Sequence, residues 1–168
     1  YSAHWDHLGM GLPDDVGHSV YNGAVDNATG TAALLELARA YGKQPRPKRS
    51  VVFLALTAEE RGLLGSEYYA ANPLYPLDQT AALINMDALA PNGVTRDFSI
   101  SGSAKLDLLD RLTARAAKLN VSYTPDPKPE AGSFFRSDHF PFAKRGVPAI
   151  SFKSGQDWAQ GGVNAGNA

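Results

Sequence analysis

Two largely apolar runs and two helix-like segments give the chain its overall pattern. Residues 50–57 (SVVFLALT) and 80–87 (TAALINMD) are almost continuously apolar, which predicts strands covered on both faces, as in a parallel sheet. Residues 29–41 and 104–119 carry leucine and alanine at helical spacing, which predicts helices with one apolar face. Strands that alternate with helices in this way indicate an α/β fold built in layers.

Shorter segments complete the predicted order of elements. Residues 98–101 and 148–153 are predicted as strands, residues 66–71 as a helix, and residues 139–145 as a short helical turn. Three prolines within residues 123–130 exclude the interior of a helix, so we expect an exposed loop there. Without repeats or long charged runs, the chain is predicted to form one domain over residues 1–160, followed by a mobile tail over residues 161–168.

The composition is that of a globular domain, and it argues against several classes of function. The chain has 168 residues, of which 43% are apolar, and at this length folding can bury roughly 70% of the extended chain's surface. A formal net charge of −1 argues against nucleic acid or an anionic membrane as the main partner. No apolar run approaches the ~20 residues that cross a bilayer. The lack of cysteine excludes disulfides, a thiolate zinc site and a cysteine nucleophile.

Acidic and imidazole side chains follow the predicted strands or precede a predicted helix. In open α/β sheets the binding crevice forms outside the carboxyl ends of the strands, so residues at these positions are candidates for chemistry. The candidates are His4, Asp26, Glu59, Glu60, Asp87 and His139. Imidazole and carboxylate without thiolate suit Zn²⁺ or a similar divalent ion. Two histidines and three carboxylates, one of them bridging, could hold two ions about 3.5–4 Å apart.

The adjacent glutamates suggest a division of roles. If the backbone of Glu59 and Glu60 is extended, the two side chains point in opposite directions and cannot easily bind the same ion. One glutamate is then a ligand and the other a general base. His7 and His18 are assigned to no metal, although His7 is close enough in sequence to line the pocket.

Each of these residues also has an ordinary structural explanation when it is taken alone. A pair of glutamates is usually a solvated surface pair, Asp26 could cap the helix that follows it, and Asp87 could start a turn. A single histidine such as His139 is more often a surface or core residue than a ligand. The set favours a site because several of its members fall on the same expected edge of the sheet.

Five ordered motifs, spread over residues 4–153, resemble a known family. They are HWDHLG from His4, GAVDNATG from Gly23, TAEERGLLGS from Thr57, NMD from Asn85 and SDHFPF from Ser137. In order and wording these motifs resemble those of the co-catalytic zinc aminopeptidases, a group similar to glutamate carboxypeptidase, the transferrin-receptor ectodomain and glutaminyl cyclase. The resemblance implies a three-layer α/β sandwich whose mixed, mostly parallel central sheet has helices on both faces. It also implies that both ends of the domain are incomplete in this chain.

The resemblance implies a role for each matched residue. One zinc would be held by His4 and Asp87 and a second by Glu60 and His139, with Asp26 bridging them. Glu59 would act as the general base on a metal-bridging water, and Asp6 would orient His4 from outside the ligand set. A cis peptide bond between Asp26 and Asn27 is a further expectation from the family.

The implied activity is hydrolysis of a peptide bond next to a free N-terminus, with a peptide as the partner. A carboxypeptidase, a dipeptidase and a single-zinc cyclase on the same scaffold stay open as alternatives. So do an inactive binding or receptor module, and a chain that acts only within a larger protein. From the family we expect a secreted or periplasmic location. The side-chain preference, the oligomeric state and the residues that bind the substrate's amine have no signal in the sequence.

Overall fold

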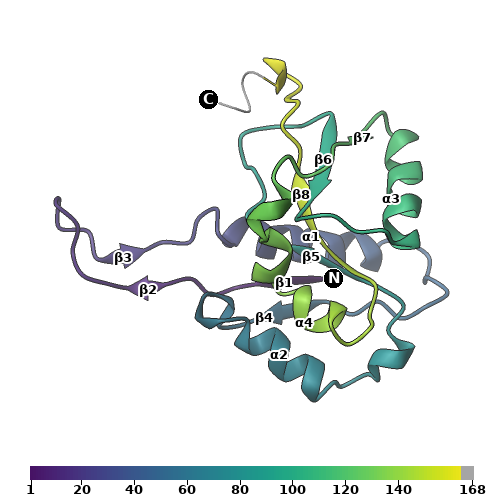
Figure 1. Cartoon of the computed structure of the whole chain (residues 1–168), viewed down its shortest axis with the longest axis horizontal. Helices are drawn as coiled ribbons and strands as arrows, with labels where there is room; N and C mark the ends of the chain where they lie inside the picture. The colour runs from purple at the N-terminus through teal and green to yellow at the C-terminus, as the bar shows by residue number, and fades with distance from the viewer. Residues whose placement is uncertain (164–168) are drawn as a thin grey trace.

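A six-stranded sheet forms the centre of the computed structural model, which describes residues 1–163 (Figure 1). Its strands are β1 (Ser2–His4), β4 (Leu54–Leu56), β5 (Leu83–Met86), β6 (Asp97–Ile100), β7 (Ser122–Tyr123) and β8 (Ala149–Ser154). They lie in the order β4-β1-β5-β8-β6-β7, and every neighbouring pair is parallel except β6 and β8. The predicted mixed, mostly parallel sheet is therefore confirmed.

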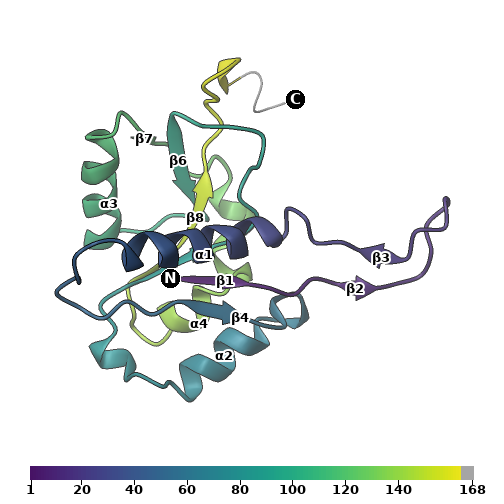
Figure 2. The same cartoon turned by 180° about the vertical axis from the view of Figure 1, so that it is seen from behind.

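Helices cover both faces of this sheet, as the two opposite views show (Figures 1 and 2). The helices are α1 (Ala28–Gly42), α2 (Leu64–Ala71), α3 (Asp107–Ala117) and α4 (Phe140–Ala143), with short 3₁₀ turns η1 (Glu59–Arg61), η2 (Leu77–Gln79), η3 (Pro129–Ala131) and η4 (Ser133–Arg136). Alternation along β5 separates the layers: Leu83 packs in one cluster with Phe142 of α4, whereas Ile84 packs against the cluster that contains Leu109 of α3. The three-layer sandwich is confirmed.

The predicted elements occur in the predicted order, but the strands are shorter than the apolar runs. The run over residues 50–57 contains only the three strand residues of β4. β4 lies at the edge of the sheet and pairs with β1 through Ser2, Ala3 and His4, and the flanking Tyr1 also bonds to Val52 and Leu54. The apolar run therefore extends beyond the ladder available to it.

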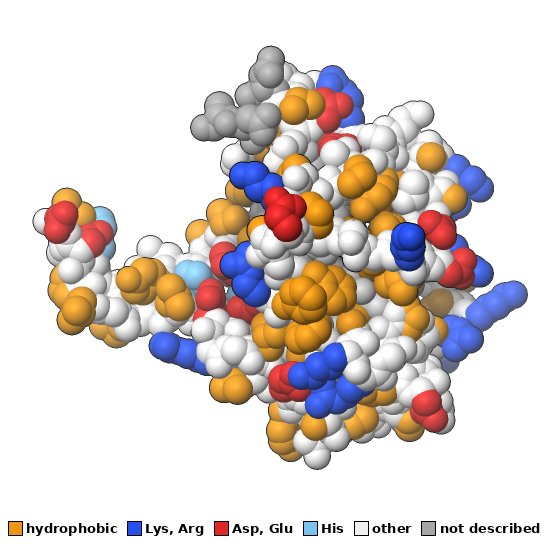
Figure 3. Space-filling model, in the orientation of Figure 1, with side chains coloured by type: hydrophobic (Ala, Val, Ile, Leu, Met, Phe, Trp, Pro, Cys, Tyr) orange, Lys and Arg blue, Asp and Glu red, His pale blue; other side chains and the backbone are white. Residues whose placement is uncertain are grey.

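A hairpin arm projects from the body of the molecule and was not predicted (Figures 1 and 2). Its strands β2 (Gly9–Met10) and β3 (Val20–Tyr21) pair antiparallel over two residues each. Large apolar side chains on the arm are exposed, including Met10 and Val20, and Figure 3 shows them along its length. The two-residue strands are too short to give a period-two pattern, so the sequence does not predict them.

The remaining predictions concern the loop and the chain end. Residues 123–130 form a loop, as expected, although β7 ends at Tyr123 and the 3₁₀ turn η3 begins at Pro129. The predicted tail falls mostly on residues 164–168, which lie outside the described residues, and the domain boundary at residue 160 stays a prediction. Within residues 1–163, no helix combines the length and apolar character needed to span a membrane.

We predict that Gly30→Ala destabilises the fold, because α1 begins in close contact with β5. A Cβ at Gly30 would lie 2.5 Å from the carbonyl oxygen of Met86, and closer still to Oδ1 of Asn27. Such overpacking costs about 1–3 kcal/mol of unfolding free energy, which urea denaturation would measure. Gly42→Ala, at the other end of the same helix, is the control, because its Cβ would meet nothing within 4 Å. Equal stability of the two variants would contradict the prediction.

Candidate metal centre

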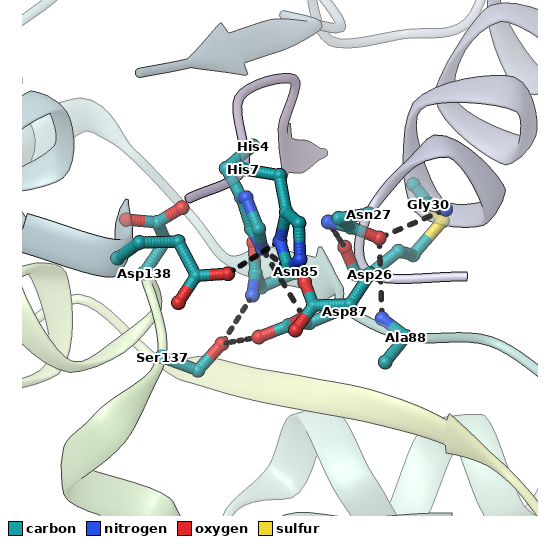
Figure 4. Close-up of polar contacts among 12 residues, drawn as sticks. His4, His7, Asp26, Asn27, Gly30, Asn85, Asp87, Ala88, Ser137 and Asp138 are labelled. Atoms are coloured by element: carbon teal, nitrogen blue, oxygen red, sulfur yellow. Dashed lines mark hydrogen bonds and ion pairs between the residues drawn. The ribbon is translucent and has the colours of Figure 1, made fainter. Parts of the chain in front are cut away.

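The carboxyl ends of three neighbouring parallel strands bring most of the candidate residues to one edge of the sheet. His4 is the last residue of β1, Asp87 follows β5, and the turn that carries Glu59 and Glu60 follows β4. Figure 4 shows His4, Asp26 and Asp87 facing one another, and Figure 3 shows acidic and histidine side chains where the arm joins the body. The predicted convergence at the strand ends is what the structure shows.

His4, Glu59 and Asp87 form a first group whose potential ligand atoms all lie within 4.8 Å of one another. Nε2 of His4 lies 3.3 Å from Oδ1 of Asp87. Nδ1 of the same ring is 3.1 Å from the main-chain carbonyl oxygen of Asp6. Because a carbonyl oxygen can only accept, Nδ1 carries a hydrogen and Nε2 faces the carboxylates. If Nε2 loses the hydrogen that it shares with Asp87, the ring is left in the tautomer in which Nε2 can bind a cation.

Asp26, Glu60 and His7 form a second group with the same close spacing. Nδ1 of His7 lies 2.7 Å from Oε1 of Glu60. Oδ1 of Asp26 lies 3.2 Å from Nε2 of His4, a member of the first group. Asp26 therefore lies between the two groups, the place that a bridging ligand needs.

The start of α1 shows that Asp26 does not cap the helix. The N-cap residue is Asn27, whose Oδ1 accepts hydrogen bonds from the backbone N–H groups of Gly30 (3.0 Å) and Ala88 (3.1 Å). Nδ2 of Asn27 donates to the carbonyl oxygen of Met86 (3.1 Å). The peptide bond between Asp26 and Asn27 is cis, as expected. The Asp26 carboxylate is thus left for the two groups of ligand atoms.

Glu59 and Glu60 diverge, but not for the predicted reason. They lie in the 3₁₀ turn η1 rather than in extended backbone, and neither is exposed. A 3₁₀ turn has about three residues per turn, so successive side chains still point in different directions. Glu59 faces the first group and Glu60 the second. The solvated surface pair, the ordinary explanation for two adjacent glutamates, does not describe them.

The pKa values of two carboxyl groups at this edge are raised because acidic side chains lie close together there. Burial, with the negative charges of Asp87, Asp138 and Glu60, raises the pKa of Glu59 to about 8. Burial and the charges of Asp87 and Glu60 also raise the pKa of Asp26. These carboxyl groups would therefore ionise more readily if cations lay among them.

His4 and Asp87 each shift the pKa of the other within this acidic surrounding. Burial alone would lower the pKa of His4, but the hydrogen bond and charge of Asp87, with the charge of Glu59, raise it to about 9. Burial alone would raise the pKa of Asp87, but hydrogen bonds from His4 and Ser137 hold it below its ordinary value. The two side chains therefore favour opposite charges.

His139 is buried but belongs to neither group. Its ring meets that of Phe134 edge to face, with the centroids 4.8 Å apart, and neither ring nitrogen has a hydrogen-bond partner. Burial lowers the pKa of His139 to about 4, which keeps the ring neutral. A neutral imidazole is the form that binds a metal. The structure thus brings His4, Asp26, Glu60 and Asp87 together, whereas His139 is a member of neither close group.

The histidines assigned to no metal differ from each other. His18 lies on the arm with its side chain 80% exposed. His7 faces Glu60, and its signal in the sequence is its position three residues after His4, just beyond the same strand.

Asp6, which was predicted to orient His4, contacts the His4 ring mainly through its backbone. The carboxylate of Asp6 lies 3.8 Å from Nδ1 of His4, so the main-chain carbonyl of Asp6 makes the closer contact.

Residues around the groups were missed by the sequence reasoning. Ser137 donates to Oδ2 of Asp87 (2.7 Å), and Asn85 donates to Ser137 (2.8 Å). Asp138 is fully buried and accepts a hydrogen bond from Ser66 (2.6 Å), while burial raises the pKa of Asp138 to about 6. Asn85 lies in the NMD motif, and Ser137 and Asp138 lie in the SDHFPF motif, which was the signal available in the sequence. Membership of a motif does not by itself predict which side chains are in contact.

The donor set fits a divalent cation. Imidazole and carboxylate are the ligands that zinc takes in the absence of thiolate. Several of the side-chain atoms at this edge are buried without a hydrogen-bond partner, which is uncommon for polar groups in a folded protein. They include Oδ1 of Asp6, Oδ1 of Asp26 and both ring nitrogens of His139. A cation among them would satisfy such atoms.

Three known proteins illustrate what this chain is similar to. A probable zinc metalloprotease of Pyrenophora tritici-repentis is 34% identical over 118 residues, which cover 67% of this chain and 27% of the relative. Aminopeptidase YwaD of Bacillus subtilis is 28% identical over 137 residues, covering 77% of this chain and 28% of the relative. The solved structure of BSAP, a zinc aminopeptidase from Bacillus subtilis, matches with a TM-score of 0.61 at 26% identity, covering 92% of this chain and 35% of that structure.

The family assignment rests on a match along almost the whole sequence. The chain spans less than a third of the length of the two curated relatives, so it corresponds to one part of them. The family described as Peptidase family M28 matches residues 1–163. This chain therefore belongs to peptidase family M28.

Proposed function

We propose that this protein is a zinc-dependent exopeptidase that removes N-terminal residues from peptides. The observation that carries the proposal is the pair of adjacent groups of ligand atoms with Asp26 between them. These two groups lie at the carboxyl ends of the strands, the edge of the sheet at which α/β proteins form their binding sites. The relatives that are named as aminopeptidases support the same conclusion.

Two zinc ions are part of the proposal. His4 and Asp87 would hold one ion, Glu60 and His139 the other, and Asp26 would contact both. The side chains that face each other in the first group support the first assignment. The two unpartnered nitrogens of the buried His139 ring support the second. His7 contacts Glu60 and would steady that carboxylate.

The chain's own groups suggest how hydrolysis would proceed. When bound, zinc ions act as Lewis acids that lower the pKa of water and polarise a carbonyl group. Glu59 would take a proton from the attacking water and pass it to the leaving amine, the role of a general base followed by that of a general acid. Glu59 lies with His4 and Asp87, so the proton acceptor is within reach of the first ion's position. The reaction needs no covalent intermediate on a serine.

An open cavity beside the second group would give a peptide access. Trp5, Asp6, His7 and Tyr21 line it together with the first turns of α1. Trp5 and Tyr21 are exposed, which leaves apolar surface for the side chains of a substrate.

The test of the proposal counts ions and then compares substrates. Metal analysis of the purified protein should give two zinc ions per chain. It should give one for His139→Ala and two for His18→Ala, a matched control on the exposed arm. Amino-acid p-nitroanilides should be hydrolysed and their N-acetylated forms left intact. Cleavage of N-blocked peptides from the C-terminus would instead establish a carboxypeptidase, and a protein without bound metal would end the proposal.

Asp6→Asn is predicted to weaken zinc binding about tenfold. Loss of a partner behind a metal-bound imidazole typically lowers metal affinity 10–100-fold. We expect the lower end because the main-chain carbonyl of Asp6 keeps its contact with Nδ1 of His4 after the substitution. Equilibrium competition with a chromophoric chelator measures the change, and Asp14→Asn on the exposed arm is the control. An unchanged affinity would remove Asp6 from the site.

A further inference from the structure

A chain of three hydrogen bonds crosses the sheet and ends on Asp87. Oγ of Ser2 donates to Oδ1 of Asn85 (2.6 Å). Nδ2 of Asn85 donates to Oγ of Ser137 (2.8 Å), and Oγ of Ser137 donates to Oδ2 of Asp87 (2.7 Å). Figure 4 shows the last two links. Ser2 and Asn85 are completely buried and Ser137 is 4% exposed, so water does not compete with these bonds.

The chemistry of the groups fixes the direction of the chain. The amide nitrogen of Asn85 can only donate, so Oγ of Ser137 accepts this bond and has one hydrogen to give. The nearest acceptor for that hydrogen is Oδ2 of Asp87. Every bond in the chain therefore points the same way, toward the carboxylate.

The backbone holds this series of hydrogen bonds in place at both ends. Ser2 and Asn85 are register partners in the parallel pair β1 and β5, so the first link follows from the pairing of the sheet. Ser137 precedes Asp138, which is fixed by the hydrogen bond from Ser66 of α2 (2.6 Å). The links thus join elements that are already packed rather than mobile side chains.

We infer that Ser2, Asn85 and Ser137 are positioning residues that hold the Asp87 carboxylate in its metal-binding orientation. Ser137 holds Oδ2, while Oδ1 is turned toward Nε2 of His4, 3.3 Å away. A carboxylate that is fixed through one oxygen loses less rotational freedom when the other oxygen binds a cation. The inference rests on the proposed function, since it takes Asp87 to be a zinc ligand.

The test measures zinc affinity in the purified full chain. Ser137→Ala should weaken binding of the zinc held by His4 and Asp87 about tenfold, within the usual range for partners of metal ligands. Ser2→Ala should weaken zinc binding less, about two- to threefold, because Ser2 is linked to Asp87 only through the further hydrogen bonds of Asn85 and Ser137. In the Ser137→Ala background, Ser2→Ala should have no further effect, because the relay is already broken. A merely structural role of Ser2 would not produce that dependence.

Ser151→Ala is the matched control. Ser151 is completely buried on β8 and is the register partner of Asn85, but its hydroxyl has no hydrogen-bond partner. Its removal should leave the zinc affinity unchanged. Thermal melting of each metal-free variant, and the visible absorption of the cobalt-substituted proteins, show whether a change in affinity comes from the ligand geometry or from unfolding.

The outcomes separate this inference from the proposed function. The inference is overturned if Ser137→Ala binds zinc as tightly as the unchanged protein, if Ser151→Ala loses as much affinity, or if the two serine effects simply add. If the affinities follow the expected order but no N-terminal residue is released from peptides, the relay stands and the proposed activity fails. If the unchanged protein binds no zinc, both are overturned.

Discussion

Glu59→Gln should retain zinc and lose most of its turnover, by about 10²–10⁴-fold in kcat, the usual contribution of a general base. Glutamine has nearly the same shape but cannot accept the proton. Glu59 lies in the first group with His4 and Asp87, so it is close to the proposed chemistry. Hydrolysis of an amino-acid p-nitroanilide, measured beside the zinc content of the same sample, checks the prediction.

Two companion variants make the Glu59 result interpretable. Glu130→Gln changes an exposed glutamate elsewhere and should leave both turnover and zinc unchanged. Glu60→Gln should lose zinc, because Glu60 is proposed as a ligand rather than as the base. Full activity of the Glu59→Gln variant with two zinc ions bound would show that another group takes the proton.

Asp26→Ala is expected to weaken both zinc ions together, by at least about 100-fold, which is the upper end of the effect of losing an outer partner. Its carboxylate lies between the two groups, so no other side chain in the second group takes its place beside His4. Chelator competition would show two weakened sites in one titration. Asp78→Ala, in the 3₁₀ turn η2, is the control.

A selective loss of one zinc in Asp26→Ala would contradict the bridging role. It would instead make Asp26 a ligand of a single ion. Because Asn27 and not Asp26 caps α1, we expect the metal-free variant to keep the helix, which far-ultraviolet circular dichroism would verify.

The layers of the fold could be predicted because they depend on apolar periodicity. The helix predicted over residues 29–41 is α1, and the run over residues 80–87 contains β5. Strand lengths could not be predicted in the same way, because the length of β4 depends on how many residues its partner offers. The arm was missed because two residues per strand leave no pattern to detect.

In the candidate site, too, the positions of residues along the chain could be predicted, but their contacts in the folded structure could not. His4, Asp26, Glu60 and Asp87 were predicted from their positions at element ends, and the structure brings them together. His7 lies in the HWDHLG motif, but its contact with Glu60 depends on how the chain turns after β1, which the motif does not specify. Hydrogen-bonded neighbours such as Ser137 depend on tertiary packing in the same way.

The side chain of Asn27 has a consequence for ion selectivity. It follows Asp26 directly, and it binds Met86 and Ala88, the two residues that flank Asp87. One fully enclosed amide thus clamps the backbones that carry both aspartates, and their separation is set by the protein before any cation arrives. If the proposed ions bind there, a cation of a different radius would meet a spacing of the two aspartates that these hydrogen bonds resist changing.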